Sequence, residues 1–240
     1  MSAFMNKILD FSIEREVLQA NPQARYIIGI DEVGRGPLIG PVVAGAVCFR
    51  VADFGVTPEV EKDLQAVRDS KRLTEKQREA LVPVIERNFW TATGSASAAT
   101  IDRVNILEAS FLAMKEALGA VRRLMEREIG AKIPDREILL LVDGNQRIPN
   151  VSLAQETIVG GDARVKSIAA ASIVAKVARD RLLTEYDTQW PEYGFAKHKG
   201  YGTKVHMLAL EKFGPLSEHR QSFKPVAQAT LRFRELGILN

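Results

Sequence analysis

An apolar stretch that ends in two adjacent acids constrains the fold of this 240-residue chain more than any other feature. Residues 26–30 have the apolar, β-branched composition of a buried strand, and Asp31 and Glu32 follow directly. A carboxylate at the end of a buried strand is costly unless a nearby positive charge compensates it. A divalent cation supplies that charge, so the sequence predicts a metal site where this strand ends.

The glycines after these acids allow two interpretations. Gly34, Gly36 and Gly40 are typical of the glycine-rich turn of a dinucleotide-binding fold, but that turn must open a helix. Residues 41–49 instead form a β-branched run that predicts a second strand. We therefore expect a turn between two strands, at which the first strand ends or twists so that both acids share one site.

The composition, 46% hydrophobic and 26% charged, is that of an ordinary soluble globular chain with one large domain, or with one domain and an appendage. The single cysteine, Cys48, excludes a disulfide within the chain and thiolate metal sites, so the expected compartment is a reducing cytoplasm. Charges interrupt each apolar run in the first 18 residues, which predicts neither a signal peptide nor a membrane span.

Periodicity and capping signals predict alternating helices and strands in the rest of the chain. Thr74 and Gln77 have the spacing of a capping box that opens a helix, and Pro83 predicts a kink or break in it near Ala80. The other expected elements are a short helix before residue 26, strands at 89–96 and 137–142, one long helix at 101–128, and an alanine-rich helix from 167 to about 185.

Two further acids follow the same pattern as the first pair. Asp143 comes directly after the strand at 137–142, and Asp162 precedes the alanine-rich helix, whose N-terminal amides and dipole would face a phosphate or metal site. Asp143 alone would be read as a turn or helix cap, but two strands that end in acids predict one convergent site. Asp180 lies inside the helix between two arginines, so we interpret it as a salt-bridging residue.

Five separate blocks of this chain together resemble the bacterial ribonuclease HII family, which cuts the RNA strand of RNA/DNA hybrids. The blocks are IDEVGRGP at 30–37, DSKRLT at 69–74, LVDGN at 141–145, GGDARVKSIAAASIVAKVARDR at 160–181 and HKGYGTKVH at 198–206. The resemblance covers residues 26 to about 223. The related type III enzymes carry a sizeable extra N-terminal domain, and the 25 residues before Tyr26 favour type II.

The resemblance implies an α/β architecture: a ribonuclease H-like mixed sheet flanked by helices, with a C-terminal helical extension. The expected division is an N-terminal extension at 1–25, a catalytic domain at 26–224 and a tail at 225–240. The implied catalytic and metal-ligating residues are Asp31, Glu32, Asp143 and Asp162. Oxygen ligands without histidine or cysteine favour Mg²⁺ or Mn²⁺, and two such ions would activate water and stabilise the leaving oxygen.

The same resemblance implies which residues contact the nucleic acid. The turn Gly34-Arg35-Gly36 and Tyr201 would read the ribose 2′ hydroxyl, Lys71 would hold a phosphate, and Ser172 lies in a matching block. The aromatic and basic residues at 193–204 suit a nucleic-acid groove better than a core, whereas Arg78 is expected on a solvated surface. His198 and His206 are expected to be structural or to contact phosphate.

The implied activity is hydrolysis of RNA/DNA hybrids and cleavage on the 5′ side of single ribonucleotides in duplex DNA, by a monomer with no membrane partner. Two other classes stay open: a non-catalytic nucleic-acid-binding module and a nucleotide-binding oxidoreductase. The tail at 228–233 loosely resembles the peptides that bind bacterial sliding clamps. The alternative for this tail is a C-terminal helix that covers the core with Leu231 and Phe233.

Overall fold

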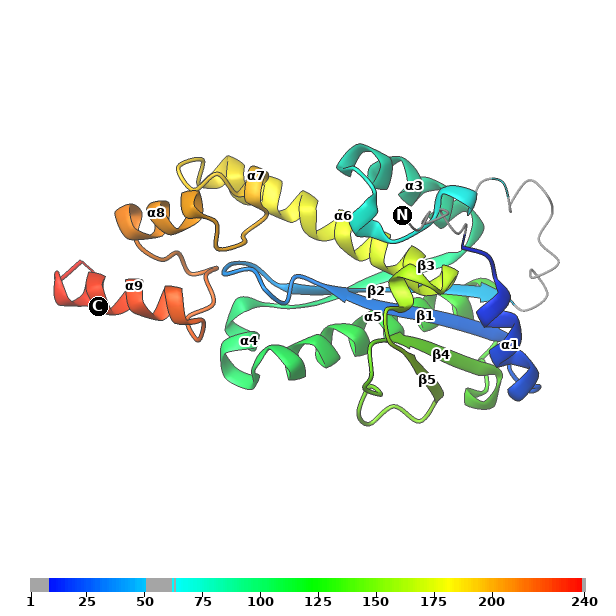
Figure 1. Cartoon of the computed structure of the whole chain (residues 1–240). Coiled ribbons are helices and arrows are strands. Elements are labelled where there is room, and N and C mark those ends of the chain that lie inside the picture. The colour runs from blue at the N-terminus through cyan, green and yellow to red at the C-terminus, as the bar shows by residue number, and fades with distance from the viewer. Residues whose placement is uncertain (1–8, 51–61, 63, 239–240) are drawn as a thin grey trace, which may run out of the picture.

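A five-stranded mixed sheet forms the centre of the molecule (Figure 1). The structure is a computed structural model that describes residues 9–50, 62 and 64–238. The strand order is β3-β2-β1-β4-β5, in which β1, β2 and β3 pair antiparallel while β1, β4 and β5 pair parallel. The strands are β1 (Tyr26–Val33), β2 (Val42–Arg50), β3 (Trp90–Ala96), β4 (Ile138–Asp143) and β5 (Ala154–Ile158). The expected mixed sheet, with antiparallel first strands, is confirmed.

Helices cover both faces of this sheet. In Figure 1 the long helix α5 lies below the strands and α6 lies above them, while α7, α8 and α9 extend beyond the sheet to the left. The helices are α1 (Ser12–Ala20), α3 (Glu75–Asn88), α4 (Ala98–Val104), α5 (Ile106–Ile129), α6 (Lys166–Gln189), α7 (Phe195–His198), α8 (Lys204–Phe213) and α9 (Lys224–Glu235). No helix in these described residues combines the length and apolarity needed to cross a membrane.

The alanine-rich helix α6 packs very closely against the middle of the sheet. A Cβ atom on Gly29 of β1 would lie 2.3 Å from the backbone of Ser167, and one on Gly45 of β2 would lie 2.2 Å from the carbonyl oxygen of Ala171. Only glycine fits at such distances, so the two strands accept the helix backbone directly. The close packing predicted from the alanines is therefore confirmed.

Helix α3 begins as predicted, but Pro83 does not break it. Thr74 and Gln77 form the expected capping box, with both reciprocal contacts present. The break expected near Ala80 is wrong, because α3 is assigned without interruption from Glu75 to Asn88. Pro83 lies on the exposed face of the helix, where water can bond to the carbonyl group that the proline leaves free.

The single helix expected at 101–128 is wrong. Asn105 has φ 75°, which ends α4, and its side-chain oxygen then accepts hydrogen bonds from the amides of Leu107 and Glu108 and so begins α5. The apolar periodicity continues across this junction because both helices cover the same sheet face, and so it hides the change of direction.

The C-terminal segment forms helix α9 and confirms only half of the helical alternative. Phe233 is buried against Gly214, but Leu231 is 59% exposed. The aromatic residues Tyr193 and Phe195 are also buried, in a small cluster with Ile39 and Leu183, so their expected place in a nucleic-acid groove is wrong. They are buried because α7 packs against α6, where the two rings stack on each other with centroids 5.1 Å apart.

Candidate active site

Asp31 and Glu32 lie within β1 rather than at its end. The strand continues to Val33, with Glu32 opposite Ala44 of β2, so the expectation that it ends at the acids is wrong. The alternative, a twist of the strand at this point, stays a prediction. Adjacent strand residues point to opposite faces. Asp31 accordingly contacts Ser172 of α6, whereas Glu32 faces a hollow that Phe111 and Met114 of α5 line.

Asp143 lies beside these two acids because β4 is parallel to β1. Ile30 pairs with Val142, so Asp143 comes one step beyond that pair, next to Asp31. Its Oδ1 accepts a 2.7 Å hydrogen bond from the amide of Gly161. That contact brings in the short turn Gly161–Ala163, which carries the buried side chain of Asp162. The three acidic segments therefore converge, as the sequence predicted.

The carboxylates hold more negative charge than their surroundings neutralise. Burial raises the pKa of Asp31 well above its usual value, and repulsion from Asp143, Glu32 and Asp162 adds to the effect. Burial also raises the pKa of Glu32, which the guanidinium of Arg35 at 3.2 Å partly opposes. The pKa of Asp143 is raised by burial and by Asp162, against the hydrogen bond from Gly161. Such a group favours a bound cation.

Lys71 reaches this cluster from the loop before α3. Asp69 caps the turn Ser70–Arg72 by accepting from the amide of Lys71, and the Lys71 Nζ donates to Asp162 Oδ2 at 2.8 Å. The hydrogen bond to Asp162 raises the pKa of Lys71, so the ammonium group stays charged. The side chain of Lys71 is 81% exposed, so it can also meet a phosphate.

Ser172 lies beneath the carboxylates and not on the surface. It is 1% exposed, contacts Asp31 and lies 3.0 Å from Ser70 Oγ. It supports the position of Asp31 and links α6 to the loop that carries Lys71. Direct contact of Ser172 with nucleic acid stays a prediction.

Asp180 has a different environment from Asp162. It is 2% exposed and forms ion pairs with Arg78 of α3 at 3.2 Å and with Lys176 at 2.6 Å. This agrees with its interpretation as a salt-bridging residue. The surface position expected for Arg78 is wrong, because the buried Asp180 and the carbonyl groups of Ser70 and Leu73 hold its guanidinium inside.

The turn after β1 lies against Tyr201, as the family resemblance implied. A Cβ on Gly36 would lie 3.5 Å from Cε1 of the Tyr201 ring, which is 48% exposed. The amide of Leu38 donates to the carbonyl of Gly200 at 2.8 Å and fixes this approach. The exposed residues Arg35 and Gly36 thus lie beside the ring, and Arg35 also contacts Glu32 at 3.2 Å.

The sequence analysis missed two buried arginines that hold this turn. Arg179 donates to the carbonyl groups of Ile39, Pro41 and Lys199, and Arg220 donates to those of Gly34, Arg35 and Gly40. Their partners are backbone atoms, far away in sequence for all but Lys199. Nothing in the local pattern identifies such contacts.

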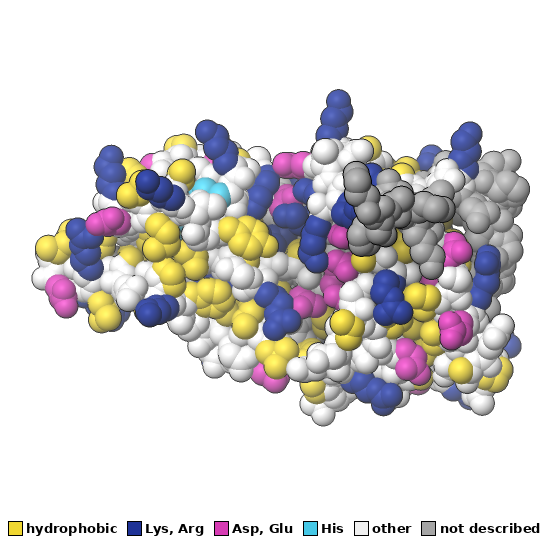
Figure 2. Space-filling view, in the orientation of Figure 1, with side chains coloured by type: hydrophobic (Ala, Val, Ile, Leu, Met, Phe, Trp, Pro, Cys, Tyr) yellow, Lys and Arg dark blue, Asp and Glu magenta, His cyan; other side chains and the backbone are white. Residues whose placement is uncertain are grey.

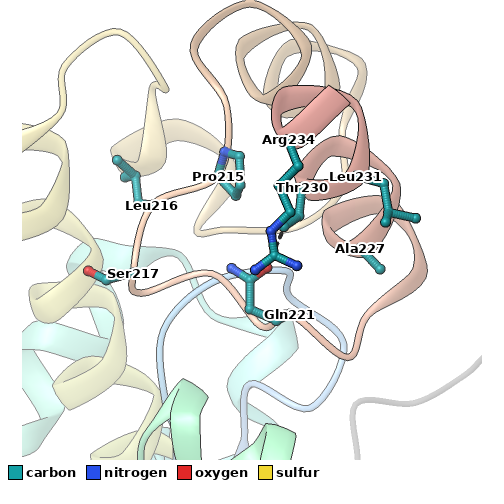
Figure 3. Close-up of a pocket in the computed structure, with 8 residues that line it drawn as sticks. All are labelled: Pro215, Leu216, Ser217, Gln221, Ala227, Thr230, Leu231 and Arg234. Carbon is teal, nitrogen blue, oxygen red and sulfur yellow. Dashed lines mark hydrogen bonds between the residues drawn. The ribbon is translucent and has the colours of Figure 1, made fainter. Parts of the chain in front are cut away.

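Two hollows differ in their relation to the acids. One, of about 250 Å³, is lined by Glu32, Asp143 and Asn145 and by residues of α5. In Figure 2, acidic and basic side chains lie side by side across the middle of the face shown. The other hollow, of about 510 Å³, lies between residues 215–217 and α9 (Figure 3). There the Thr230 hydroxyl donates a hydrogen bond to the side-chain oxygen of Gln221. No residue predicted for catalysis, metal or nucleic-acid binding lines it.

The donor set fits a hard divalent cation. Four carboxylates without sulfur or nitrogen ligands suit Mg²⁺ or Mn²⁺. The burial that raises the pKa values of Asp31, Glu32 and Asp143 also makes a compensating cation favourable there. Among the described residues, no three His, Cys, Asp or Glu side chains lie close enough together to enclose an ion. The carboxylates would therefore draw together around a cation, with Asp162 released from Lys71.

Similar solved structures identify the class of the fold. Ribonuclease H2 from Pyrococcus horikoshii aligns with a TM-score of 0.66 at 24% identity, over 88% of this chain and 99% of that one. A complex of PCNA with ribonuclease HII from Archaeoglobus fulgidus gives 0.63 at 24% identity, over 85% and 96%. Bst ribonuclease HIII in complex with Mn²⁺ gives 0.63 at 15% identity, over 91% and 73%. The fold is therefore ribonuclease H-like.

The sequence itself identifies the family. The family model for ribonuclease HII matches residues 28–226. Ribonuclease HII from Vibrio parahaemolyticus is 45% identical over 211 residues, which is 87% of this chain and 89% of that protein. The chain belongs to the ribonuclease HII family, and is thus an endonuclease of the ribonuclease H type, a divalent-metal-dependent family that acts on nucleic acid.

Proposed function

We propose that this enzyme hydrolyses the RNA strand of RNA/DNA hybrids and cuts on the 5′ side of single ribonucleotides in duplex DNA, leaving 3′ hydroxyl and 5′ phosphate ends. The observation that carries this proposal is the position of Tyr201 and the glycine turn beside the acids. Metal and phosphate contacts treat RNA and DNA alike. The group that recognises the 2′ hydroxyl must therefore lie close to the cleavage site. The contact of Arg35 with Glu32 and of Gly36 with Tyr201 supports that role for the turn and the ring.

The four carboxylates would hold two Mg²⁺ or Mn²⁺ ions, and such ions supply an activated water and stabilise the leaving 3′ oxygen. The protein supplies the positions. Gly161 fixes Asp143 through its amide, Ser172 supports Asp31, and Arg35 orients Glu32. The exposed Lys71 leaves Asp162 to contact the phosphate when substrate and metal bind.

Cleavage of one labelled duplex tests the proposal. The duplex carries a single ribonucleotide and is incubated with Mg²⁺, with Mn²⁺ or with a chelator, beside an all-DNA duplex of the same sequence and a long hybrid. We expect metal-dependent cuts 5′ of the ribonucleotide, with a product end that ligase accepts only when a 5′ phosphate is present. Cleavage of the all-DNA duplex, or cuts on the 3′ side, would contradict it.

The exposed Leu231 supports a separate proposal about the tail. The archaeal neighbour was solved in complex with PCNA, and residues 228–233 of this chain lie on α9 with Leu231 outward and Phe233 inward. A clamp contact through this segment would therefore use Leu231. Pull-down of the sliding clamp by the intact protein, but not by Leu231→Ala, supports the contact. Equal capture by the intact protein and by Leu231→Ala would exclude Leu231 as the contact residue.

A further inference from the structure

A short segment of the C-terminal part runs beside the turn that follows β1. The amide of Gly40 donates to the carbonyl of Glu218 and the amide of Arg220 donates to that of Leu38, each at 2.9 Å, with Ile39 opposite His219. The side chains of His219 and Arg220 are both fully buried. Two adjacent residues thus enter the interior directly beneath the Gly34–Gly36 turn.

Arg220 determines the direction of two peptide groups in that turn. Its Nη2 donates to the carbonyl of Gly34 at 2.6 Å and its Nη1 to that of Arg35 at 2.9 Å. It forms no salt bridge with a carboxylate in the described part of the chain, so these carbonyl groups and the ring of Phe223 solvate its charge. Arg220 therefore cannot release them without leaving a buried cation unsolvated.

Because a peptide group is planar, the contact that fixes each carbonyl group also fixes the direction of the N–H group next to it. In a trans peptide the C=O and the next N–H point in opposite directions. With the Gly34 and Arg35 carbonyl groups turned towards Arg220, the amides of Arg35 and Gly36 point away from it. Both residues are exposed, and neither amide donates to another described residue. At these two peptides, the turn offers substrate a pair of donors and no acceptor.

His219 is connected to Tyr201, on the other side of the same site, through His206. The amide of Leu216 donates to its Nδ1 at 2.9 Å, so the neutral ring carries its proton on Nε2. That Nε2 lies 3.0 Å from Nε2 of His206, which must accept, so His206 donates from Nδ1 to the carbonyl of Tyr201 at 3.0 Å. A directed chain of hydrogen bonds therefore runs from Leu216 to the backbone of Tyr201.

We propose that His219 and Arg220 are positioning residues that set ribonucleotide selectivity: Arg220 aims the two free amides of the turn, and His219 fixes the Tyr201 backbone through His206. The proposal rests on the proposed reading of the 2′ hydroxyl. The carbonyl groups of Gly34 and Arg35 are occupied by Arg220, so they do not contact that hydroxyl. The turn then recognises the 2′ hydroxyl as a hydrogen-bond acceptor, through the amides of Arg35 and Gly36.

Arg220→Lys tests the first half. Lysine keeps the charge but cannot reach several carbonyl groups in one plane. We expect kcat on the single-ribonucleotide duplex to fall by about 10- to 100-fold, the loss that a small misplacement causes. KM, the affinity for all-DNA duplex and the Mn²⁺ concentration for half-maximal activity should be unchanged. Arg122→Lys is the matched control, because Arg122 also donates to a backbone carbonyl, that of Ile133, and should keep full activity.

A pair of substitutions at His219 tests the second half and does not depend on whether Arg220→Lys folds. Glutamine places an amide donor near the position of Nε2, and asparagine places an acceptor near that of Nδ1. We expect His219→Gln to keep most of the selectivity for the ribonucleotide duplex over all-DNA duplex and His219→Asn to lose about tenfold or more. If His219 only braces the 214–219 loop through its contact with Leu216, His219→Asn should instead be the more selective of the two variants.

The failures of the two proposals are distinguishable. A wild-type protein that does not cut the ribonucleotide duplex overturns the proposed function. An active wild type with Arg220→Lys at full kcat, or with cleavage and all-DNA affinity falling by the same factor, overturns the role of Arg220. An active wild type in which His219→Asn is more selective than His219→Gln overturns the role of His219.

Discussion

Lys71 Nζ and Asp162 Oδ2 lie 2.8 Å apart, which places the ammonium group of one loop on a carboxylate that is expected to bind metal. A cation at Asp162 must displace this contact, so lysine and metal compete for the same oxygen. The pair also explains how a highly exposed lysine keeps a defined position before substrate arrives. This competition should appear as a change in metal affinity when Lys71 is replaced.

Lys71→Met should bind Mn²⁺ more tightly in the absence of substrate. The gain should be a few-fold, because exposed ion pairs contribute about 1 kcal/mol or less. Titration calorimetry with Mn²⁺ alone measures it, and KM for substrate should rise in the same variant as the phosphate contact is lost. Unchanged Mn²⁺ affinity would mean that Asp162 does not ligate the ion.

Asp143→Asn should remove nearly all cleavage and leave the fold intact. The amide has the shape of the carboxylate but binds a hard cation weakly. Because burial and Asp162 raise the pKa of Asp143, loss of its charge should also raise the thermal midpoint of the metal-free protein. Activity above about a tenth of wild type at saturating metal, a loss below ~1.4 kcal/mol, would exclude Asp143 as a ligand.

Asp162→Asn and Asp180→Asn should fail in different ways. The first should lose cleavage with little change in stability. The second should lose about 3 kcal/mol or more in urea unfolding, because Arg78 and Lys176 lose the buried carboxylate that compensates their charges. Its activity per folded molecule should stay near wild type. Equal inactivity of two folded variants would show that the assignment of Asp162 over Asp180 is wrong.

The buried histidines should make the protein less stable in acid. Burial lowers the pKa of His206 to about 4 and, with repulsion from His206, that of His219 to about 3, below their unfolded value. The unfolded state then binds more protons, so stability is full above the unfolded pKa and falls as the pH falls. Asp31, Glu32 and Asp143, whose pKa values are raised, act in the opposite direction.

The contribution of His219 can be isolated by comparison with His219→Gln. From pH 7 to pH 5, the free energy of unfolding of wild type should fall about 2 kcal/mol further than that of the variant. Urea unfolding at both pH values measures the difference. Parallel decreases in the two proteins would show that His219 titrates normally in the folded state.

Gly45→Ala should destabilise the protein strongly, by about 3 kcal/mol, because its Cβ would lie 2.2 Å from the carbonyl oxygen of Ala171 in α6. Gly119→Ala is the control. Gly119 lies within α5 and meets only the flexible Arg123 side chain at 3.2 Å, so alanine there should stabilise by up to about 1 kcal/mol. Thermal unfolding of both variants measures the two changes in stability.

The sequence by itself determined the elements whose signals are local. The apolar run before Asp31, the β-branched residues of β2 and the capping box at Thr74 each identify a strand or helix, because propensity and capping act within a few residues. The acids after two such strands also predicted their convergence, since parallel neighbours end at one edge of a sheet. Local periodicity failed at Asn105, where a single positive φ redirects the chain.

Only the tertiary structure decided which atoms surround these acids and the turn beside them. Asp31 and Glu32 share a site across two faces of one strand because Asp143 of β4 lies beside them. Lys71, Arg179 and Arg220 have partners that are distant in sequence, and several of these partners are backbone carbonyl groups. Every residue carries such a group, so no side-chain pattern identifies the one that a buried arginine will solvate; packing alone selects it.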